Sequence, residues 1–330
     1  MELAWRLARR LGDGRFHSGQ QLAEELGVTR STVWNALQSL QDRGLEVFAV
    51  RGKGYRLPEP IDWLEADRIL ATLPAAVRRR IGDLEVLGET DSTNARLVSA
   101  APPLPGQTRV CLAEYQTSGR GRRGRRWLSS LGTGVCLSLA WQFQQPDREI
   151  SALGLIAGLN VRATLLAAGA DDVMLKWPND LVVGERKLGG ILVEMRAEGN
   201  GPAHVVIGVG INHRLAAADF KRIESAGGLA ATDLTQHRAT GLPPRNELAG
   251  QLIAGLVDGL ASFSAAGARG LTAAWRAADA LEGQRIAVEM GGETLVGMAA
   301  GIDEDGALLL NQAGAVSRVT AGDVSVRRRE

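Results

Sequence analysis

Two segments of the sequence carry the side chains best suited to binding phosphate. Residues 119–126 hold five arginines among three glycines, and no acidic residue occurs in the surrounding stretch 115–146. The second segment is Lys176-Trp-Pro-Asn-Asp180, which follows the apolar residues 173–175. Arginine binds phosphate through two parallel hydrogen bonds, whereas lysine supplies a compact point charge. Both segments therefore predict a site for an anionic, phosphate-containing ligand.

The first segment, Gly119-Arg-Gly-Arg-Arg-Gly124, matches the dinucleotide-binding pattern GxGxxG. That pattern needs a helix directly after its glycines. Residues 125–134 instead lead through two further glycines into the strand-like run 135–141. We therefore predict an arginine loop (residues 119–126) between two strands, flexible when empty and ordered by an anion. A solvated or RNA-binding arginine turn is the alternative reading of this segment.

Lys176 is notable because only four of the 38 cationic residues are lysines. A lysine at the end of a strand, in a chain that otherwise uses arginine, predicts a charge that a guanidinium cannot replace. A surface lysine before a turn is the alternative. Asn179 and Asp180 follow the rigid Pro178, so they are candidates for orienting a sugar or a metal-bound phosphate. Asp180 is the candidate metal ligand, and cysteine–histidine metal spacing is absent from the sequence.

Residues 1–60 have the pattern of a winged helix-turn-helix. Apolar spacing and capping residues predict helices at 2–11, 19–26 and 30–43, followed by two strands around a cationic turn. The polar start of the third helix is where such domains read DNA bases, and the turn can neutralise phosphates. The candidate DNA-binding residues are Arg30, Ser31, Thr32, Asn35 and Lys53. A winged helix used for protein contacts is the alternative.

The rest of the chain divides at about residue 278. In residues 61–278 several strand-like runs follow one another without an intervening helix, which favours an α+β mixed sheet over a doubly wound parallel one. In residues 279–330 short strands alternate with Gly-rich or acidic turns, which predicts a small β-barrel. The 330 residues contain two cysteines, 45% hydrophobic residues and no secretory h-region, and their apolar runs are short. We therefore expect a cytoplasmic protein without a disulfide framework or a membrane span.

Five motifs occur in a characteristic order along the chain: Asp91-Ser-Thr-Asn94, Glu114-Tyr-Gln116 with the arginine loop, Lys176-Trp-Pro-Asn-Asp180, Lys187-Leu-Gly-Gly-Ile-Leu-Val-Glu194 and Gly208-Val-Gly-Ile-Asn212. Together they resemble the biotin–protein ligases. The winged helix, with Gly52-Lys-Gly-Tyr55 in its wing, is similar to the branch of that family that also represses the biotin operon. The resemblance implies a central sheet like that of class II synthetases and a C-terminal SH3-like barrel.

The resemblance also implies a two-step reaction. The biotin carboxylate attacks the α-phosphate of ATP, with Mg²⁺, to give biotinyl-5′-AMP and pyrophosphate. A lysine of a carboxylase's biotin-carrier domain then attacks the mixed anhydride. Operator DNA and a ligand-promoted homodimer are the further partners that the resemblance implies. A biotin-sensing DNA-binding regulator without ligase turnover is the alternative, and lipoate or octanoyl transfer on the same fold is a more distant one.

The family motifs assign roles to residues of this chain. Lys176 and Arg122 match the catalytic cations, with Lys176 between carboxylate and phosphate. The positions that match contacts to biotin or the adenylate are Ser92, Thr93, Asn94, Gln116, Arg120, Gly121, Arg122, Trp127, Lys176, Asn179 and Asn212. Trp34 departs from the expected pattern beside the DNA-contact positions, so operator reading is less directly implied than ligation. Arg327 is a candidate contact for ATP.

Overall fold

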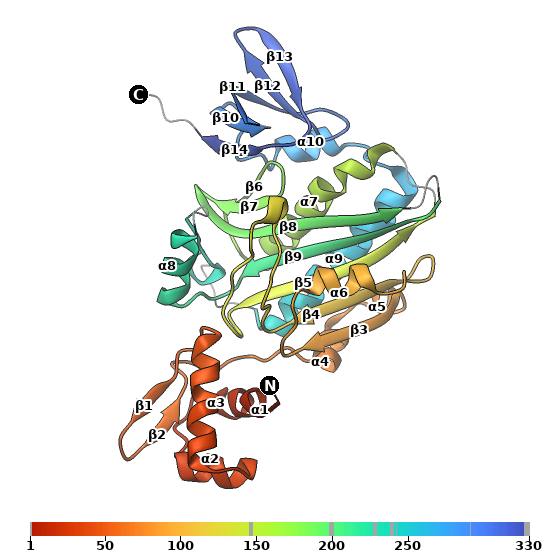
Figure 1. Ribbon diagram of the computed structural model, residues 1–330. Helices are drawn as coiled ribbons and strands as arrows, with labels where there is room; N and C mark the ends of the chain where they lie inside the picture. The colour runs from red at the N-terminus through yellow and green to blue at the C-terminus, as the bar shows by residue number, and fades with distance from the viewer. Residues whose placement is uncertain are drawn as a thin grey trace.

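The structure, a computed structural model, is built from three sheets in line (Figure 1). It describes residues 2–144, 148–197, 201–226, 230–237, 241, 243–290 and 292–326. A winged helix lies at one end, a seven-stranded sheet with its helices in the middle, and a five-stranded sheet at the other end. Arg327 lies outside the described residues. The domain boundaries at residues 60 and 278 remain predictions.

The winged helix forms as its capping residues predict. Its elements are α1 (Glu2–Leu11), α2 (Gly19–Leu26), α3 (Arg30–Asp42), β1 (Phe48–Val50) and β2 (Gly54–Arg56). Ser18 and Thr29 cap α2 and α3 by accepting hydrogen bonds from the backbone amides of Gln21 and Thr32. The buried cluster of this unit also includes Trp63 and Leu131, so the winged helix packs directly onto the middle of the chain.

The central sheet is mixed, as the sequence predicts. Its strands are β3 (Ile81–Leu87), β4 (Thr108–Ala113), β5 (Gly134–Phe143), β6 (Val173–Lys176), β7 (Asp180–Val183), β8 (Arg186–Ala197) and β9 (Ala203–Asn212), in the order β3-β4-β5-β9-β8-β7-β6. Only the β3–β4 pair is parallel among the described strands of this sheet. Strand β7, which has four residues and starts inside the Lys176–Asp180 motif, was not predicted from the sequence.

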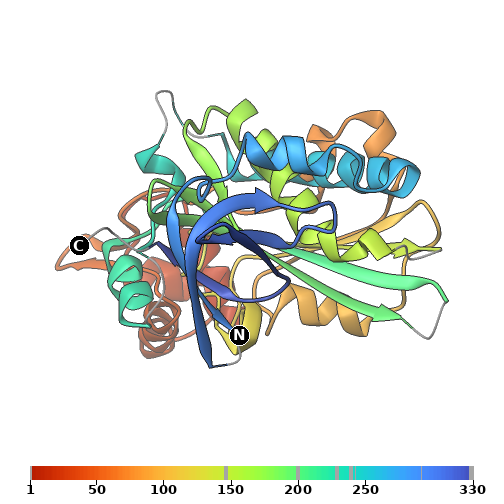
Figure 2. The same cartoon turned by 90° about the horizontal axis from the view of Figure 1, so that it is seen from above.

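Helices cover both faces of this sheet (Figures 1 and 2). The helices of the middle region are α4 (Ala66–Thr72), α5 (Ala75–Arg78), α6 (Thr93–Ser99), α7 (Leu153–Ala167), α8 (Ala217–Ser225), α9 (Arg245–Ala266) and α10 (Leu271–Arg276). Helix α6 packs on β4, β5 and β9, whereas α7 and α9 pack on each other and on the opposite face. The sequence pattern predicts helices at 92–100, 149–168 and 245–263, which correspond to α6, α7 and α9, and it does not predict α4, α5, α8 or α10.

Two of these helices are long and apolar enough to cross a membrane by length and composition alone, at Ile150–Ala167 and Arg245–Ala266. Both lie in the folded core. Helix α9 begins at the buried Arg245, whose Nη2 lies 2.8 Å from the buried Glu114 carboxylate, and α7 packs on α9, β6 and β8. We interpret both as core helices. The apolar stretch at 150–167 is longer than the short runs expected from the sequence.

The C-terminal strands form an entirely antiparallel sheet. They are β10 (Arg285–Met290), β11 (Glu293–Ile302), β12 (Leu308–Gln312), β13 (Ala315–Val319) and β14 (Asp323–Val326), in the order β13-β12-β11-β10-β14. The strands predicted at 285–290, 294–302, 307–310, 315–320 and 324–326 are all present, with ends that agree within two residues. Within the described residues, the pairings do not join β13 to β14, so they form an antiparallel sheet and do not close the expected barrel.

Candidate active site

One cavity of about 640 Å³ contains the residues that the sequence singled out for substrate binding. Its walls come from the arginine loop, the start of α6, strands β6–β9 and the C-terminal strands β10 and β14. The predicted residues that line it are Ser92, Thr93, Asn94, Gln116, Arg120, Gly121, Arg122, Trp127, Lys176, Asn179, Asp180 and Asn212. The volume lies in the range of small-molecule sites. Their individual roles remain predictions.

The end of the cavity at α6 is buried and polar. Helix α6 starts at Thr93, directly after its cap Ser92. The backbone amide and hydroxyl of Thr93 donate to Gln116 Oε1 at 2.8 and 3.2 Å. Ser138 Oγ lies 2.5 Å from Asn94 Oδ1, and Asn94 Nδ2 donates to the Glu194 carboxylate at 2.9 Å. These contacts fix hydroxyl and amide groups around the space, as recognition of a neutral polar ligand requires.

Two glycines of β9 give these side chains room. A Cβ at Gly208 would overlap Asn94 Oδ1, and a Cβ at Gly210 would lie 2.6 Å from the indole of Trp127. Trp127 directly follows the arginine loop, and its backbone amide donates to the Gly119 carbonyl at 2.9 Å. The glycines of the Gly208–Asn212 motif are therefore explained by close approach to two cavity residues.

The arginine loop is a tight hairpin-like turn, as the rejection of the dinucleotide pattern predicted. Arg120 pairs with Arg126 in an isolated β-bridge, and Gly121 donates to the Arg125 carbonyl at 2.7 Å. The only helical part is a single 3₁₀ turn, Arg122–Gly124. In it Arg123 has the left-handed φ of 54°. The chain then continues into β5.

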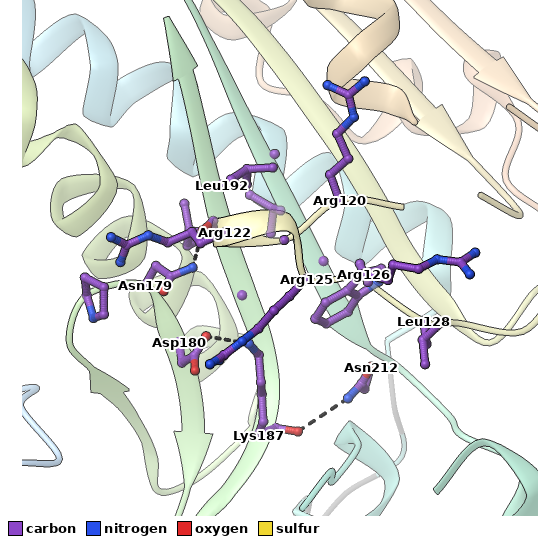
Figure 3. Close-up of a pocket in the computed structure, with 18 of the residues that line it drawn as sticks. Arg120, Arg122, Arg125, Arg126, Leu128, Asn179, Asp180, Lys187, Leu192 and Asn212 are labelled. Atoms are coloured by element: carbon purple, nitrogen blue, oxygen red, sulfur yellow. Dashed lines mark hydrogen bonds and ion pairs between the residues drawn. The ribbon is translucent and has the colours of Figure 1, made fainter. Parts of the chain in front are cut away.

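The arginines of this loop point in different directions (Figure 3). Arg120 and Arg126 point away from Asp180 and Lys187, while Arg125 reaches toward them. Arg120 pairs with Glu194 at 3.4 Å, and Arg126 donates to the Thr117 carbonyl at 2.8 Å.

Arg122 lines the cavity, and partial burial lowers the pKa of its guanidinium. Together with Arg125, it makes the loop a source of positive charge inside the cavity.

Facing the loop is a group that we name the lysine ledge: Lys176, Asp180 and Lys187. Lys176 is the last residue of β6 and is half-buried; burial lowers the pKa of its ammonium, and the Asp180 charge opposes that shift. Lys187 Nζ lies 2.5 Å from Asp180 Oδ1. Backbone pairing between β6 and β7 holds Lys176 opposite Asp180. Strand hydrogen bonds therefore fix a lysine, a carboxylate and a second lysine at one side of the cavity.

Asn179 and Asn212 line the cavity but use their amide groups for structure as well. Asn179 Nδ2 donates to the Ile191 carbonyl at 2.7 Å, which ties the turn before β7 to β8. Asn212 Nδ2 donates to the Thr232 carbonyl at 3.0 Å. Both side chains therefore hold cavity walls in place.

For several cavity residues the sequence did not predict an individual role. Among them are Arg125, Lys187, Glu289, Asp323 and Ser325. The scarcity of lysine was a usable signal for Lys187, one of the four lysines. For Asp323 the sequence offered no signal, because this residue meets the cavity only through the packing of the C-terminal sheet.

The candidate DNA-binding residues lie on α3 and in the wing of the winged helix. Arg30, Ser31 and Asn35 are exposed near the start of α3, Thr32 is half-buried, and Lys53 is exposed in the wing. Lys53 Nζ also lies 5.7 Å from the centre of the Phe16 ring. Trp34 is 55% exposed beside them, so an indole forms part of this surface. Their contact with DNA remains a prediction.

The metal-binding groups that the cavity offers suit a metal ion that is already bound to a phosphate of the substrate. Within the described residues, no group of three or more His, Cys, Asp or Glu side chains is placed to hold a metal ion. Asp180 contributes one carboxylate at the ledge. Mg²⁺ is commonly held by one or two carboxylates together with substrate phosphates, so this set fits Mg²⁺ bound to a nucleotide.

Comparison with known proteins places this architecture. Residues 89–212 match the Biotin/lipoate A/B protein ligase family, residues 7–56 an HTH domain, and residues 283–327 the Biotin protein ligase C terminal domain. The chain is 38% identical over 320 residues to the "Bifunctional ligase/repressor BirA" of Salmonella typhimurium, covering 97% of this chain and 96% of that protein. The chain belongs to the biotin protein ligase family.

Other biotin protein ligases agree with this assignment. The BirA of Escherichia coli is also 38% identical over 97% of this chain and 96% of that protein. The "Biotin--[acetyl-CoA-carboxylase] ligase" of Mycobacterium tuberculosis is 35% identical, covering 73% of this chain and 88% of that protein. Among solved structures, the biotin protein ligase of Aquifex aeolicus in complex with biotin and ATP has a TM-score of 0.61 and 26% identity, covering 75% of this chain and all of that one.

Proposed function

We propose that this protein is an ATP-dependent biotin–protein ligase that also acts as a biotin-responsive transcriptional repressor. The observation that carries the proposal is the cavity in which the arginine loop, the lysine ledge and the buried polar residues of α6 meet. It combines groups for a neutral ring system with groups for a phosphate. The relatives of this chain include a bifunctional ligase/repressor and a biotin–[acetyl-CoA-carboxylase] ligase, which supports the same assignment.

In the first step the biotin carboxylate attacks the α-phosphate of ATP, and pyrophosphate leaves. Lys176 is the proposed catalytic cation between the carboxylate and the phosphate, since a half-buried ammonium at the end of a strand is rigidly placed. Arg122 adds charge from the loop. Cations fixed where negative charge develops lower the barrier for transfer at phosphorus.

The polar end of the cavity is the proposed biotin end. Ser92, Thr93, Asn94 and Gln116 offer buried hydroxyl and amide groups for the ureido ring, whose donors and acceptors need partners once water is excluded. Arg120, Gly121, Arg122 and Trp127 close over the product, while Asn179 and Asn212 shape the nucleotide side. A closed loop keeps water from the anhydride.

Asp180 and the phosphates of ATP would together hold Mg²⁺, which would neutralise phosphate charge. Asp180 is the ledge carboxylate available to it, although the same carboxylate already contacts Lys187. The fit rests on this single carboxylate and on the phosphates of the nucleotide.

In the second step a lysine amine of a carboxylase's biotin-carrier domain attacks the anhydride carbonyl. An amide bond to biotin forms, AMP leaves, and the amine loses a proton. Mass spectrometry of a candidate carrier domain, incubated with the protein, ATP, Mg²⁺ and biotin, tests the proposal. We expect one added biotinyl group, which disappears when the acceptor lysine is changed to arginine. An unmodified carrier domain without pyrophosphate release would favour a biotin-sensing regulator without turnover.

The proposed repressor role is supported by the winged helix and by the similarity of this chain to bifunctional ligase/repressors. Arg30, Ser31, Thr32 and Asn35 on α3 are proposed to read an operator, with Lys53 on a phosphate. A homodimer promoted by the adenylate would present two winged helices to a two-fold operator. Operator binding can be measured by fluorescence anisotropy with a labelled DNA duplex from the region upstream of the gene for this protein. The protein should bind this DNA more tightly when biotin and ATP are both present. We expect the protein to work in the cytoplasm, where it meets both DNA and carrier.

A further inference from the structure

Asp323 connects the C-terminal sheet to the arginine loop. It is the first residue of β14, and it lines the cavity. Its Oδ2 lies 2.8 Å from Arg125 Nη2 and 3.2 Å from Arg123 Nη1. Arg123 Nη1 also donates to the carbonyl of Glu289, the residue that pairs with Asp323 in the β10–β14 ladder, at 3.4 Å. One edge of the C-terminal sheet therefore holds two arginines of the loop.

These contacts address an electrostatic problem of the loop itself. Five arginines lie within eight residues that include no acid, so their mutual repulsion favours an open loop. In the described part of the chain, the ion pairs of the loop's arginines go to Glu194 and Asp323. Asp323 is shared by two of them. It takes part in two of these three ion pairs, which oppose the repulsion within the loop.

The backbone at Arg123 supports the same interpretation. Its φ of 54° is in the left-handed region, which costs a non-glycine residue free energy. Two glycines, Gly121 and Gly124, flank this turn, so the loop has other conformations within reach. The contacts of the Arg123 side chain to β10 and β14 favour the turn observed.

We propose that Asp323 is a positioning residue that docks the arginine loop on the C-terminal sheet and so retains the acyl-adenylate in the cavity. This inference rests on the proposed ligase function. Asp323 acts through Arg123 and Arg125, so its removal should speed escape of the intermediate more than it slows its formation. A carboxylate acting on Mg²⁺ or ATP would have the opposite signature, because it would slow adenylate formation.

The test uses the full-length protein with Asp323→Asn, which keeps the side-chain shape and removes the charge. Enzyme is loaded with labelled biotin, ATP and Mg²⁺, and pyrophosphate release measures adenylate formation. A chase with unlabelled biotin and ATP then measures the loss of enzyme-bound biotinyl-5′-AMP. We expect loss to be about fivefold faster, the size expected for a partly exposed ion pair of about 1 kcal/mol, with pyrophosphate release changed less than about twofold.

Two further variants guard against a simple folding defect. Arg125→Gln removes one partner from the loop, where the Arg125 side chain is 68% exposed, and should also speed adenylate loss. The double variant should lose adenylate no faster than Asp323→Asn alone, because the two residues act on one interaction. Glu293→Gln, which removes an exposed carboxylate of the same sheet, is the matched control and should behave as the unchanged protein.

The possible results distinguish the positioning role of Asp323 from the proposed ligase function. Equal adenylate retention in Asp323→Asn and the unchanged protein would overturn the positioning role. So would a loss of pyrophosphate release as large as the loss of retention, which would indicate direct contact with the nucleotide. If the unchanged protein releases no pyrophosphate, the proposed ligase function itself fails.

Discussion

The arginine loop and the lysine ledge bring positive charge to the same cavity by opposite means. The ledge is built into β6, β7 and β8, and the Lys187–Asp180 ion pair at 2.5 Å locks it further. The loop is a turn rich in glycine whose arginines rely on Glu194 and on Asp323 from another sheet. The lysine ledge therefore holds its positive charge at a fixed position. The arginine loop carries positive charge that moves toward or away from the cavity as the loop closes or opens.

This difference suggests a division of labour between the two regions. A charge that stabilises a transition state must already be in place when the reaction occurs, which suits a strand end. A charge that covers an intermediate must open for substrates and for the carrier domain, which suits a loop. Substitutions in the ledge should therefore reduce the rate of adenylation, whereas substitutions in the loop should reduce retention of the product.

The largest effect is expected at the ledge. Lys176→Ala should slow adenylation by several powers of ten, about 3–5 kcal/mol, because the cation acts mainly in the transition state. Pyrophosphate release with biotin and ATP is the measurement. Lys221→Ala, which removes an exposed lysine from α8 outside the cavity, is the control and should leave the rate unchanged. Near-normal turnover in Lys176→Ala would remove this residue from the mechanism.

The next largest effect on activity is expected when a methyl group is added at Gly210, next to Trp127. In Gly210→Ala the new Cβ would lie 2.6 Å from the Trp127 indole, so Trp127 must move. Displacement of about 1 Å near a reacting centre costs about 10²-fold, and kcat/KM for biotin should fall by about that factor. The control is Gly154→Ala in α7, where the Cβ meets only an ordinary contact with Val193. Equal kcat/KM in both variants would show that the loop's exit does not need a fixed Trp127.

Arg122→Gly tests the covering role of the arginine loop. Loss of this guanidinium should release the adenylate early, so that biotinylation of a bystander protein such as serum albumin rises about tenfold, the value of one charge-assisted hydrogen bond. Arg126→Gly is the comparison, since Arg126 points away from the ledge and should change bystander labelling less. Strict target selectivity in Arg122→Gly would contradict the covering role of the loop.

The smallest effect is a shift in pH dependence. Burial lowers the pKa of Lys176, so this ammonium loses its proton at a lower pH than an ordinary lysine does, while guanidinium groups stay charged. Adenylation kcat/KM, which reports the free enzyme, should therefore decline on the alkaline side below the ordinary lysine pKa of about 10.4. Lys176→Arg should abolish that decline in whatever activity it keeps. An unchanged alkaline limb in this variant would assign the decline to another group.

Local sequence signals predicted the winged helix and much of the cavity. Ser18 and Thr29 are caps that act on the next turn, and the arginine loop and Lys176 stand out by residue type alone. Both kinds of signal need no knowledge of distant residues. Strand β7 was not predicted, because its four residues are too few to show the alternation of apolar and polar side chains that marks a strand.

Long-range packing set the limit of prediction. The Arg125–Asp323 contact joins residues 198 positions apart, and no pattern in the sequence links them. The docking of the winged helix on Trp63 and Leu131 is similar, because each residue is merely apolar in sequence. The expected barrel also depended on an edge pairing between β13 and β14, which strand patterns do not specify.

A crystal structure of the protein with biotinyl-5′-AMP would show whether the arginine loop and Lys176 meet around the adenylate. We expect the arginine loop to be folded over the adenylate and Lys176 Nζ to lie within hydrogen-bonding distance, about 3 Å, of the acyl-phosphate oxygens. An outward-pointing loop, with Lys176 separated from the adenylate by more than one water molecule, would contradict this expectation.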